Sequence, residues 1–409
     1  MKILFLCNKS PWPPKEGGPM AMNMLVEGLI EAGHSVKILA VNSYKYNIPA
    51  RDIPQPYIEK TGIELIDVDL RVKIRDGLIN LFTGRSYHVQ RFISRDFSKR
   101  LEAVLRADEY DIVQMETLYM SPYLEMVREH SHALIFLRAH NIEHRIWQRI
   151  TEETTNPFRR WYIRHLAKTL KTYELGIIHS YDGIVAISPT DADYFRGIML
   201  EKNQKLSFAH SPAIIDIPFG IDPKSYEITN EDMEFPSLFT LGAMNWIPNQ
   251  DGIRWFLTNV WPDIHKQFPS LKYYLAGREM PEWMQSLDLD NIEVLGEVED
   301  AKTFISSKAI MIVPLFSGSG IRIKIIEGLS MGKVIISTSM GAEGIKCKNG
   351  KNILIADQPC EFFEMISIAV GDRALCEKIG KEARELIETK YNSRSLIQKL
   401  VGFYQQVNW

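Results

Sequence analysis

The chain has 409 residues, too many for one ordinary core and about the right number for two α/β domains. Hydrophobic residues make up 45% and charged residues 24%, a globular composition that excludes extended disorder. The formal net charge of −3 excludes a molecule-wide field that attracts nucleic acid, so we expect no nucleic-acid partner.

The cysteines and the apolar runs indicate the cellular compartment. The four cysteines are scattered and form no CxxC pair, which argues against a disulfide framework or zinc site and favours a reducing compartment. The apolar run 3–7 is shorter than the roughly 7–15 residues of a signal-peptide core. No segment approaches the roughly 18 apolar residues of a membrane span. We expect a cytoplasmic protein that at most lies on the inner face of a membrane.

The first half of the chain alternates short apolar runs with amphipathic stretches, the pattern of a doubly wound parallel sheet. A loop rich in Pro and Gly separates the first strand from the first helix. Strands are predicted at 3–6, 36–41, 63–68, 112–115, 133–137 and 184–187. Helices are predicted at 21–32, 95–107, 119–130 and 157–180.

The segment 211–236 breaks this rhythm with Pro, Gly and Asp, and it is predicted to connect two domains. The alternation then restarts. Strands are predicted at 238–241, 273–276, 292–295, 310–313 and 334–337, and helices at 251–267, 300–307, 322–331 and through most of the chain after 359. The expected domains are 1–215 and 216–392, with a terminal helix at 393–409 that packs back on the first. We expect two facing Rossmann-like domains with the active site in the cleft between them.

The most informative stretch is the glycine-rich loop that joins the strand at 310–313 to the next helix. Gly318 and Gly320 allow the backbone to approach a ligand closely, and Arg322 and Lys324 add positive charge beside the positive end of a helix dipole. These features predict a diphosphate site. The alternative is a tight turn with solvated cations.

Glu327 lies on the same helix, a few residues beyond the loop. Its carboxylate is placed to accept hydrogen bonds from ribose hydroxyls while the cations hold the phosphates.

With these motifs the chain resembles the GT-B glycosyltransferases, and among them the retaining group called family 4. The resemblance covers nearly the whole length. It is carried by the Gly17-Gly18 loop, the Pro-Phe-Gly-Ile-Asp run at 218–222, the Leu-Gly-Ala-Met-Asn-Trp run at 241–246 that includes Gly242, and the stretch 313–337. It implies a nucleotide-sugar donor site and no bound metal.

The chain departs from the family pattern at the donor site. The family has a Glu-x7-Glu pair, whose second member matches Glu327 and whose first falls on Ser319. Ser319 can hydrogen-bond a sugar hydroxyl but supplies no charge. The family's Arg and Lys after the first strand of the second domain are replaced by Met244 and by Pro248-Asn249. Arg322 and Lys324 are the candidates to take over the phosphate charge.

Further candidate contacts lie elsewhere in the chain. Gly17 and Gly18 precede a helix and can admit donor phosphate or acceptor; the alternative is a loop that needs positive φ. His140 follows the strand at 133–137, and the resemblance places a histidine there over the donor sugar. Glu343 is a candidate donor contact and equally a loop residue. Glu143 and His144 are weaker candidates for acceptor binding.

The helix predicted at 157–180 begins with an unusual stretch. Residues 157–171 carry five Arg or Lys with interleaved aromatic residues and no acid. This pattern suits an anionic membrane surface. The alternative is a domain helix whose cations are solvated or paired with Glu152-Glu153.

The resulting hypothesis is retaining transfer of a sugar from a UDP- or GDP-type donor to the hydroxyl of a saccharide or lipid-linked acceptor, in polysaccharide or glycolipid assembly. Arg322 and Lys324 would stabilise the leaving diphosphate, with His140 over the sugar. The alternatives are a sugar-nucleotide epimerase or hydrolase of the same fold and a non-catalytic nucleotide-sugar binding protein. A nicotinamide oxidoreductase is disfavoured because no G-x-G-x-x-G follows the first strand. Two Asp-x-Asp patterns, at 67–69 and 288–290, lack further ligands and predict no metal site.

Overall fold

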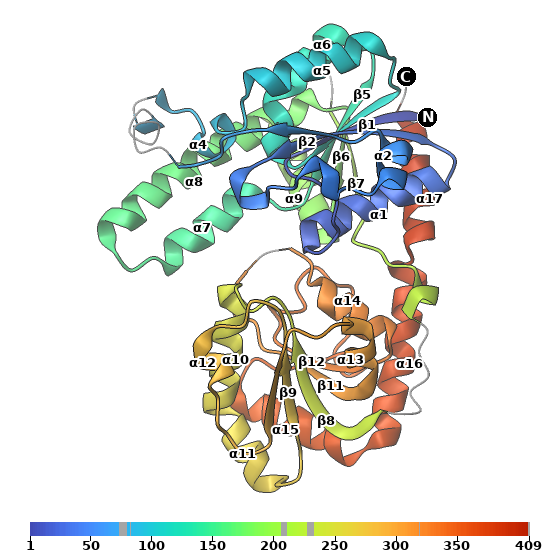
Figure 1. Ribbon diagram of the computed structural model, residues 1–409. Helices are drawn as coiled ribbons and strands as arrows, with labels where there is room; N and C mark the ends of the chain where they lie inside the picture. The colour runs from blue at the N-terminus through green and yellow to red at the C-terminus, as the bar shows by residue number, and fades with distance from the viewer. Residues whose placement is uncertain (73–79, 82, 206–210, 227–232, 319, 408–409) are drawn as a thin grey trace. The chain divides into compact units, whose positions relative to one another are not determined.

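A computed structural model gives the structure of the chain and describes residues 1–72, 80–81, 83–205, 211–226, 233–318 and 320–407. The chain forms two compact units, which consist of Met1–Phe219 with Arg394–Trp409 and of Gly220–Ser393. Each unit holds one parallel sheet (Figure 1). The predicted α/β class with two doubly wound domains is confirmed; a site in the cleft between them stays a prediction.

The first unit follows the predicted strand–helix alternation. Its strands and helices are β1 (Lys2–Cys7), α1 (Gly17–Glu31), β2 (Ser35–Asn42), α2 (Gln55–Thr61), β3 (Glu64–Asp67), α4 (Tyr87–Gln90), α5 (Arg95–Ala107), β4 (Ile112–Glu116), α6 (Leu124–His130), β5 (Leu134–Ala139), α7 (Glu143–Glu153), α8 (Pro157–Ile177), β6 (Gly183–Ala186), α9 (Pro189–Lys205), β7 (Ala213–Asp216) and α17 (Ser393–Gln406). Short 3₁₀ turns lie at Tyr44–Tyr46, Ala50–Asp52, Leu118–Tyr123 and Ile178–Ser180.

The seven strands of the first sheet are ordered β3-β2-β1-β4-β5-β6-β7. Alternate residues of β1 point to opposite faces: Leu4 and Leu6 join a core covered by α5, α6 and α9, whereas Ile3 and Phe5 join a core with α1 and α17. A Cβ atom on Gly28 of α1 would lie 2.5 Å from Ile397 of α17. The last helix of the chain therefore packs closely on the first.

Helices α7 and α8 pack against each other and project from the sheet as a hairpin (Figure 1). Asn156 caps the start of α8 by accepting a hydrogen bond from the Arg159 amide at 3.0 Å. No helix of the described residues contains an 18-residue stretch apolar enough to cross a membrane.

The second unit repeats the arrangement with six strands ordered β10-β9-β8-β11-β12-β13. Its elements are a 3₁₀ turn at Pro223–Tyr226, β8 (Glu234–Leu241), α10 (Ile247–Asn259), α11 (Trp261–Gln267), β9 (Tyr273–Ala276), α12 (Glu282–Gln285), β10 (Ile292–Gly296), α13 (Ala301–Ser307), β11 (Lys308–Val313), α14 (Ile323–Ser330), β12 (Val334–Ser337), β13 (Leu354–Ile355), α15 (Pro359–Gly371) and α16 (Arg373–Lys390).

Some predicted elements differ from the structure. The segment 211–236 is not only a connection, because β7 and the start of β8 lie within it. Helix α1 begins at Gly17 rather than near residue 21. The elements that were not predicted are α2, α4, α7, α9, α12 and β13. The stretch 119–130 is helical as predicted, but its first half is a 3₁₀ turn that contains Pro122, whose missing N–H suits an irregular turn.

Candidate active site

The strand order of the second unit reverses at its centre. From β8 the chain builds outward to β9 and β10 on one side and to β11, β12 and β13 on the other. Ligands of doubly wound sheets bind at the carboxyl ends of strands where the order reverses. The chain leaves this edge through α10 after β8 and through α14 after β11, and neither helix has a side-chain cap on its first N–H groups. Two helix N-termini with polar backbone groups therefore meet at this edge.

Arg322 is fixed between the glycine-rich loop and the loop after β8. It is the N-cap residue of α14, it is buried, and it donates a hydrogen bond to the Gly320 carbonyl at 2.6 Å. Its guanidinium lies 5.3 Å from the ring centroid of Trp246, the N-cap residue of α10. Gly318 has φ +111°, and a Cβ atom there would come within 2.7 Å of the same ring. Only glycine fits at that position.

Lys324 lies between the ends of the two central strands. Its Nζ donates to Oδ1 of Asn249 at 2.9 Å, and Nδ2 of Asn249 donates to the Ala243 carbonyl at 2.8 Å. A Cβ atom on Gly242 would lie 2.9 Å from the Asn249 amide and 3.5 Å from the Lys324 ammonium. Burial, reinforced by the charge of Arg322, lowers the pKa of Lys324 to about 7.

The side chain of Glu327, on α14, is held by a hydrogen bond. Its Oε1 accepts a hydrogen bond from the Tyr226 hydroxyl at 3.0 Å, and the Lys302 ammonium lies 4.2 Å from the Tyr226 ring centroid. Burial raises the pKa of Glu327. Glu343 follows β12 at the same edge of the sheet. The prediction for Ser319 lies outside the described residues.

The predicted site residues of the first unit lie at the carboxyl ends of its central strands. His140 follows β5, and its Nε2 is 2.6 Å from Oε2 of Glu116, the last residue of β4. Gly17 and Gly18 form the first turn of α1, and neither has positive φ. The alternative of a loop that needs positive φ is therefore wrong, and a Cβ atom on Gly18 would meet only the flexible end of the Lys9 side chain, 3.1 Å from its Cε.

Sequence reasoning missed three residues of these sites. Glu116 orients His140, Asn249 holds Lys324, and Tyr226 bonds Glu327. Glu116 had a readable signal, because it is an acid at the carboxyl end of a predicted central strand. Asn249 and Tyr226 carry no such signal, since their partners lie 75 and 101 residues away in the sequence.

A family model confirms the nature of the second unit. Residues 235–372, which span the described loop and both helix starts, match the family of glycosyl transferases group 1. The chain carries a glycosyltransferase domain.

Known proteins share the fold over the whole length. The chain has a TM-score of 0.69 to sucrose-phosphate synthase from Thermosynechococcus elongatus, at 14% identity over 100% of this chain and 99% of the other. It has a TM-score of 0.67 to Anabaena HepE in complex with UDP, at 11% identity over 99% and 100%. It is 22% identical to an uncharacterised 44.6 kDa protein in the cps region of Klebsiella pneumoniae, over 98% of each chain. The predicted GT-B fold is confirmed, and placement in family 4 stays a prediction.

Glu143 and His144 have structural partners in the first unit. Glu174 of α8, which is buried, accepts hydrogen bonds from the amides of both residues at 3.0 Å and lies 2.6 Å from Nδ1 of His144. The Tyr119 hydroxyl donates to Glu143 at 2.7 Å, and burial raises the pKa of Glu143 to about 7. These contacts satisfy the first N–H groups of α7 and fix its start. They favour a structural role over acceptor binding.

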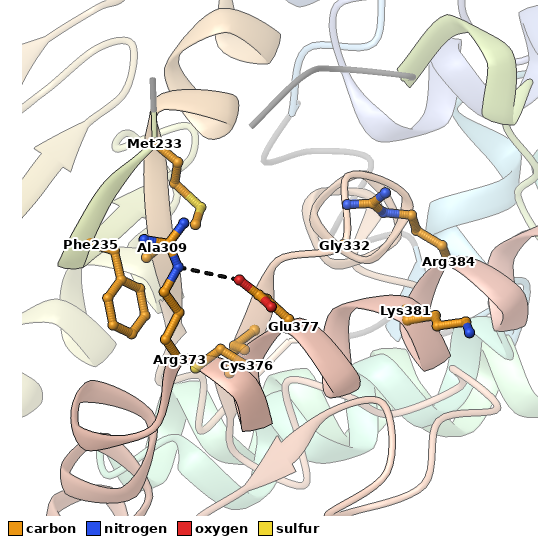
Figure 2. A pocket seen from close by; sticks show the side chains of 10 residues that line it. Met233, Phe235, Ala309, Gly332, Arg373, Cys376, Glu377, Lys381 and Arg384 are labelled. Carbon is orange, nitrogen blue, oxygen red and sulfur yellow. Dashed lines mark hydrogen bonds and ion pairs between the residues drawn. The ribbon is translucent and has the colours of Figure 1, made fainter. Parts of the chain in front are cut away.

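The structure contains a further cavity and offers no metal site in its described part. Among the described residues, no group of three or more His, Cys, Asp or Glu side chains is arranged to hold a metal ion. A cavity of about 310 Å³ lies at the amino ends of β8, β11 and β12, where Arg373 and Glu377 form an ion pair (Figure 2). It is at the opposite edge of the sheet from Arg322 and Lys324, so it is separate from the candidate active site.

Proposed function

We propose that this glycosyltransferase moves a sugar from a nucleoside diphosphate sugar to the hydroxyl of a saccharide or lipid-linked acceptor. The observation that carries the proposal is the pair of cations at the start of α14. Arg322 and Lys324 directly follow a loop in which Gly318 must be glycine, beside two uncapped helix starts. This is the chemistry that a diphosphate requires.

Each site residue has a role in the proposed reaction. Arg322 and Lys324 neutralise the diphosphate as it leaves, which is the largest catalytic contribution expected here. Glu327 binds the ribose hydroxyls in place of the Tyr226 hydroxyl or beside it. His140 contacts the reacting sugar, and Gly242 leaves room for the donor beside Lys324. Ser319 and Glu343 are proposed as sugar contacts, and Gly17 and Gly18 as the entry for phosphate or acceptor.

The donor class is supported by the structural relatives. HepE, whose fold this chain shares, was solved in complex with UDP. We propose a UDP- or GDP-type donor, with no bound metal because Arg322 and Lys324 supply the positive charge. Retention of configuration and a place in polysaccharide or glycolipid assembly rest on the resemblance to the retaining group.

A thermal-shift screen of UDP, GDP, ADP and CMP tests the donor site. A ligand at about 100 times its Kd stabilises the fold by about 2.7 kcal/mol. We expect one diphosphate to raise the melting temperature of the wild type, with and without EDTA, and to leave Arg322→Ala/Lys324→Ala unchanged. The control is Lys378→Ala/Lys381→Ala, which removes two exposed cations of α16. The absence of any shift in the wild type at millimolar nucleotide would refute the proposal.

We further propose that the tip of the α7–α8 hairpin contacts an anionic membrane surface. Phe158 and Trp161 are 86% and 60% exposed, far more than aromatic side chains of a folded domain usually are. Arg159, Arg160 and Arg164 are exposed beside them, and in the described part of the chain none of the three forms an ion pair. Exposed aromatic rings next to unpaired cations match the interface of an anionic bilayer.

Sedimentation with lipid vesicles tests this contact. We expect binding to vesicles that contain phosphatidylglycerol and little binding to pure phosphatidylcholine. Phe158→Ala/Trp161→Ala should weaken the binding through lost apolar contact. Arg159→Gln/Arg160→Gln should weaken it by about 1 kcal/mol for each cation removed. Lys378→Gln/Lys381→Gln is the matched charge control. Equal sedimentation of all variants would show that the hairpin is not the contact.

A further inference from the structure

Three energetically unfavourable features lie together beside His140. Glu116 is a carboxylate with no exposed surface at the end of β4, and its neighbour in the sheet register, Arg138, is equally buried. Nε and Nη2 of Arg138 have no hydrogen-bond partner among the described residues. Thr117, which follows Glu116, has φ 77°, a strained conformation for a β-branched residue. Apolar residues would stabilise this part of the sheet at least as well, so the arrangement indicates a functional role.

A line of buried hydrogen bonds runs from the last helix of the chain to His140. The Tyr404 hydroxyl of α17 donates to Oε1 of Gln114, and the Gln114 amide donates to Oε1 of Glu116. Oε2 of Glu116 lies 2.6 Å from Nε2 of His140. Gln114 and Tyr404 are fully buried, and 13% of the His140 side chain is exposed. Each carboxylate oxygen of Glu116 therefore has one defined partner, and only the histidine end of the line reaches the surface.

We propose that Glu116 is a positioning residue that holds His140 in the Nε2–H tautomer. A carboxylate only accepts hydrogen bonds, so Nε2 must donate to it. In the neutral ring Nδ1 is then an acceptor, suited to a hydroxyl of the sugar or of the acceptor molecule. The bond from the Gln114 amide fixes the orientation of Glu116, and Arg138 is its neighbour in the sheet register. The effect on activity rests on the proposed function; the tautomer does not.

Nitrogen NMR of histidine-labelled protein without substrate tests the tautomer, with His140→Gln to assign the signal. We expect Nε2–H in the wild type. In Glu116→Gln the side-chain amide can donate to Nε2, so the ring should change to Nδ1–H. With a working donor and acceptor, kcat/KM of Glu116→Gln should fall by about 10- to 100-fold, as for other residues that orient a functional histidine. Tyr404→Phe leaves Glu116 in place, so it should keep the tautomer and lose less activity.

Glu174→Gln is the matched control. It changes the other buried Glu–His pair of this unit, which has the same 2.6 Å separation, and it should leave the tautomer of His140 unchanged. An Nδ1–H tautomer in the wild type overturns the proposal without any variant. An unchanged tautomer in folded Glu116→Gln overturns it too. The absence of any transfer activity in the wild type would instead refute the proposed function and would not affect the tautomer result.

Discussion

Lys324 is the cation of the candidate site whose charge depends on pH near neutrality. Its pKa is lowered to about 7 by burial and by Arg322, so in the unliganded protein it loses its proton as pH rises through 7. A bound diphosphate favours the ammonium form and raises this pKa. We expect nucleotide affinity to fall as pH rises above about 7, and binding at pH 8 to take up a proton. Calorimetry in buffers of different ionisation enthalpy measures that uptake.

The Lys324→Met variant provides the control for this prediction. It should bind the nucleotide more weakly at pH 6 and show no proton uptake at pH 8. In the unliganded wild type, the unfolded chain binds more protons than the folded one between the lowered pKa of about 7 and the ordinary value of 10.5. The contribution of Lys324 to the unfolding free energy therefore rises with pH over this window. Proton uptake that persists in Lys324→Met would assign the pH dependence to another group.

Glu327 should show a conflict between stability and binding. Burial raises its pKa, so the stability that it contributes is complete below its ordinary value of 4.5 and is lost as pH rises through the folded value. Glu327→Gln should raise the melting temperature at pH 7, because its amide oxygen still accepts from Tyr226. It should weaken nucleotide binding about 10- to 100-fold, the loss expected when a hydrogen bond to a charged group is replaced.

Glu234→Gln is the opposite control for that measurement. Burial acts to raise the pKa of Glu234, but hydrogen bonds from Lys308 and Tyr274 and the charge of Lys308 lower it overall. Its contribution is therefore present above the ordinary value of 4.5 and is lost at lower pH. Glu234→Gln should lower the melting temperature at pH 7 and leave nucleotide binding unchanged. A lower melting temperature in Glu327→Gln as well would contradict the predicted cost of the buried carboxylate.

At the scale of residues, the sequence predicts the site residues that lie close to one another in the chain. Gly318, Arg322 and Lys324 were predicted because they are close in sequence to one helix start. Glu116 could be noticed as an acid at a strand end, but its partners could not be predicted, because strand register pairs it with Arg138 and its contact with His140 spans 24 residues.

At the scale of elements, the position of α10 depends on one backbone contact. A Cβ atom on Gly252 would lie 1.8 Å from the carbonyl oxygen of Pro314, the residue that follows β11. Gly252→Ala should force α10 away from the glycine-rich loop and separate Asn249 from Lys324. We expect a loss of about 1–3 kcal/mol in the free energy of unfolding, measured by denaturant titration, together with weaker nucleotide binding.

Gly176→Ala is the matched substitution in an open position. Gly176 lies near the end of α8 with no atom within 4 Å of the added Cβ. Alanine there should stabilise the protein by about 0.5–1 kcal/mol. If both variants had the same stability, the close approach of α10 to Pro314 would not be what holds α10 in position.

Most strands could be predicted from their apolar runs, since parallel strands are covered on both faces. β7 and β13 could not, because both lie among turn-forming residues and β13 has only two residues. Helix α7 is missed for a different reason. Its start is capped by Glu174, a residue of the following helix, rather than by its own N-cap residue.

At the scale of the molecule, the first unit requires the end of the chain. Leu396, Ile397, Leu400, Phe403 and Tyr404 of α17 are buried in the core that includes Phe5 and Phe136. At about 1.5–3 kcal/mol for each buried side chain, their removal costs as much as the whole stability of a typical domain. Deletion of residues 394–409 should unfold the first unit, and hydrogen exchange should show lost protection in β1 and α1.

The second unit provides the internal control for this deletion. Its core contains none of the deleted residues, so β8 and β11 should keep their protection from exchange. Loss of protection in both units would show that they fold as one.

The same arrangement sets an order of events during synthesis. The first 219 residues leave the ribosome without the helix that completes their core, and they must wait until α17, which ends at Gln406, has been made. At translation rates of about 5–20 residues per second, the wait is roughly 10–40 s, during which the surface meant for α17 is open to chaperones and proteases. A copy truncated before Ser393 would lack α17, so we expect proteases to cleave its first unit faster than that of the full chain.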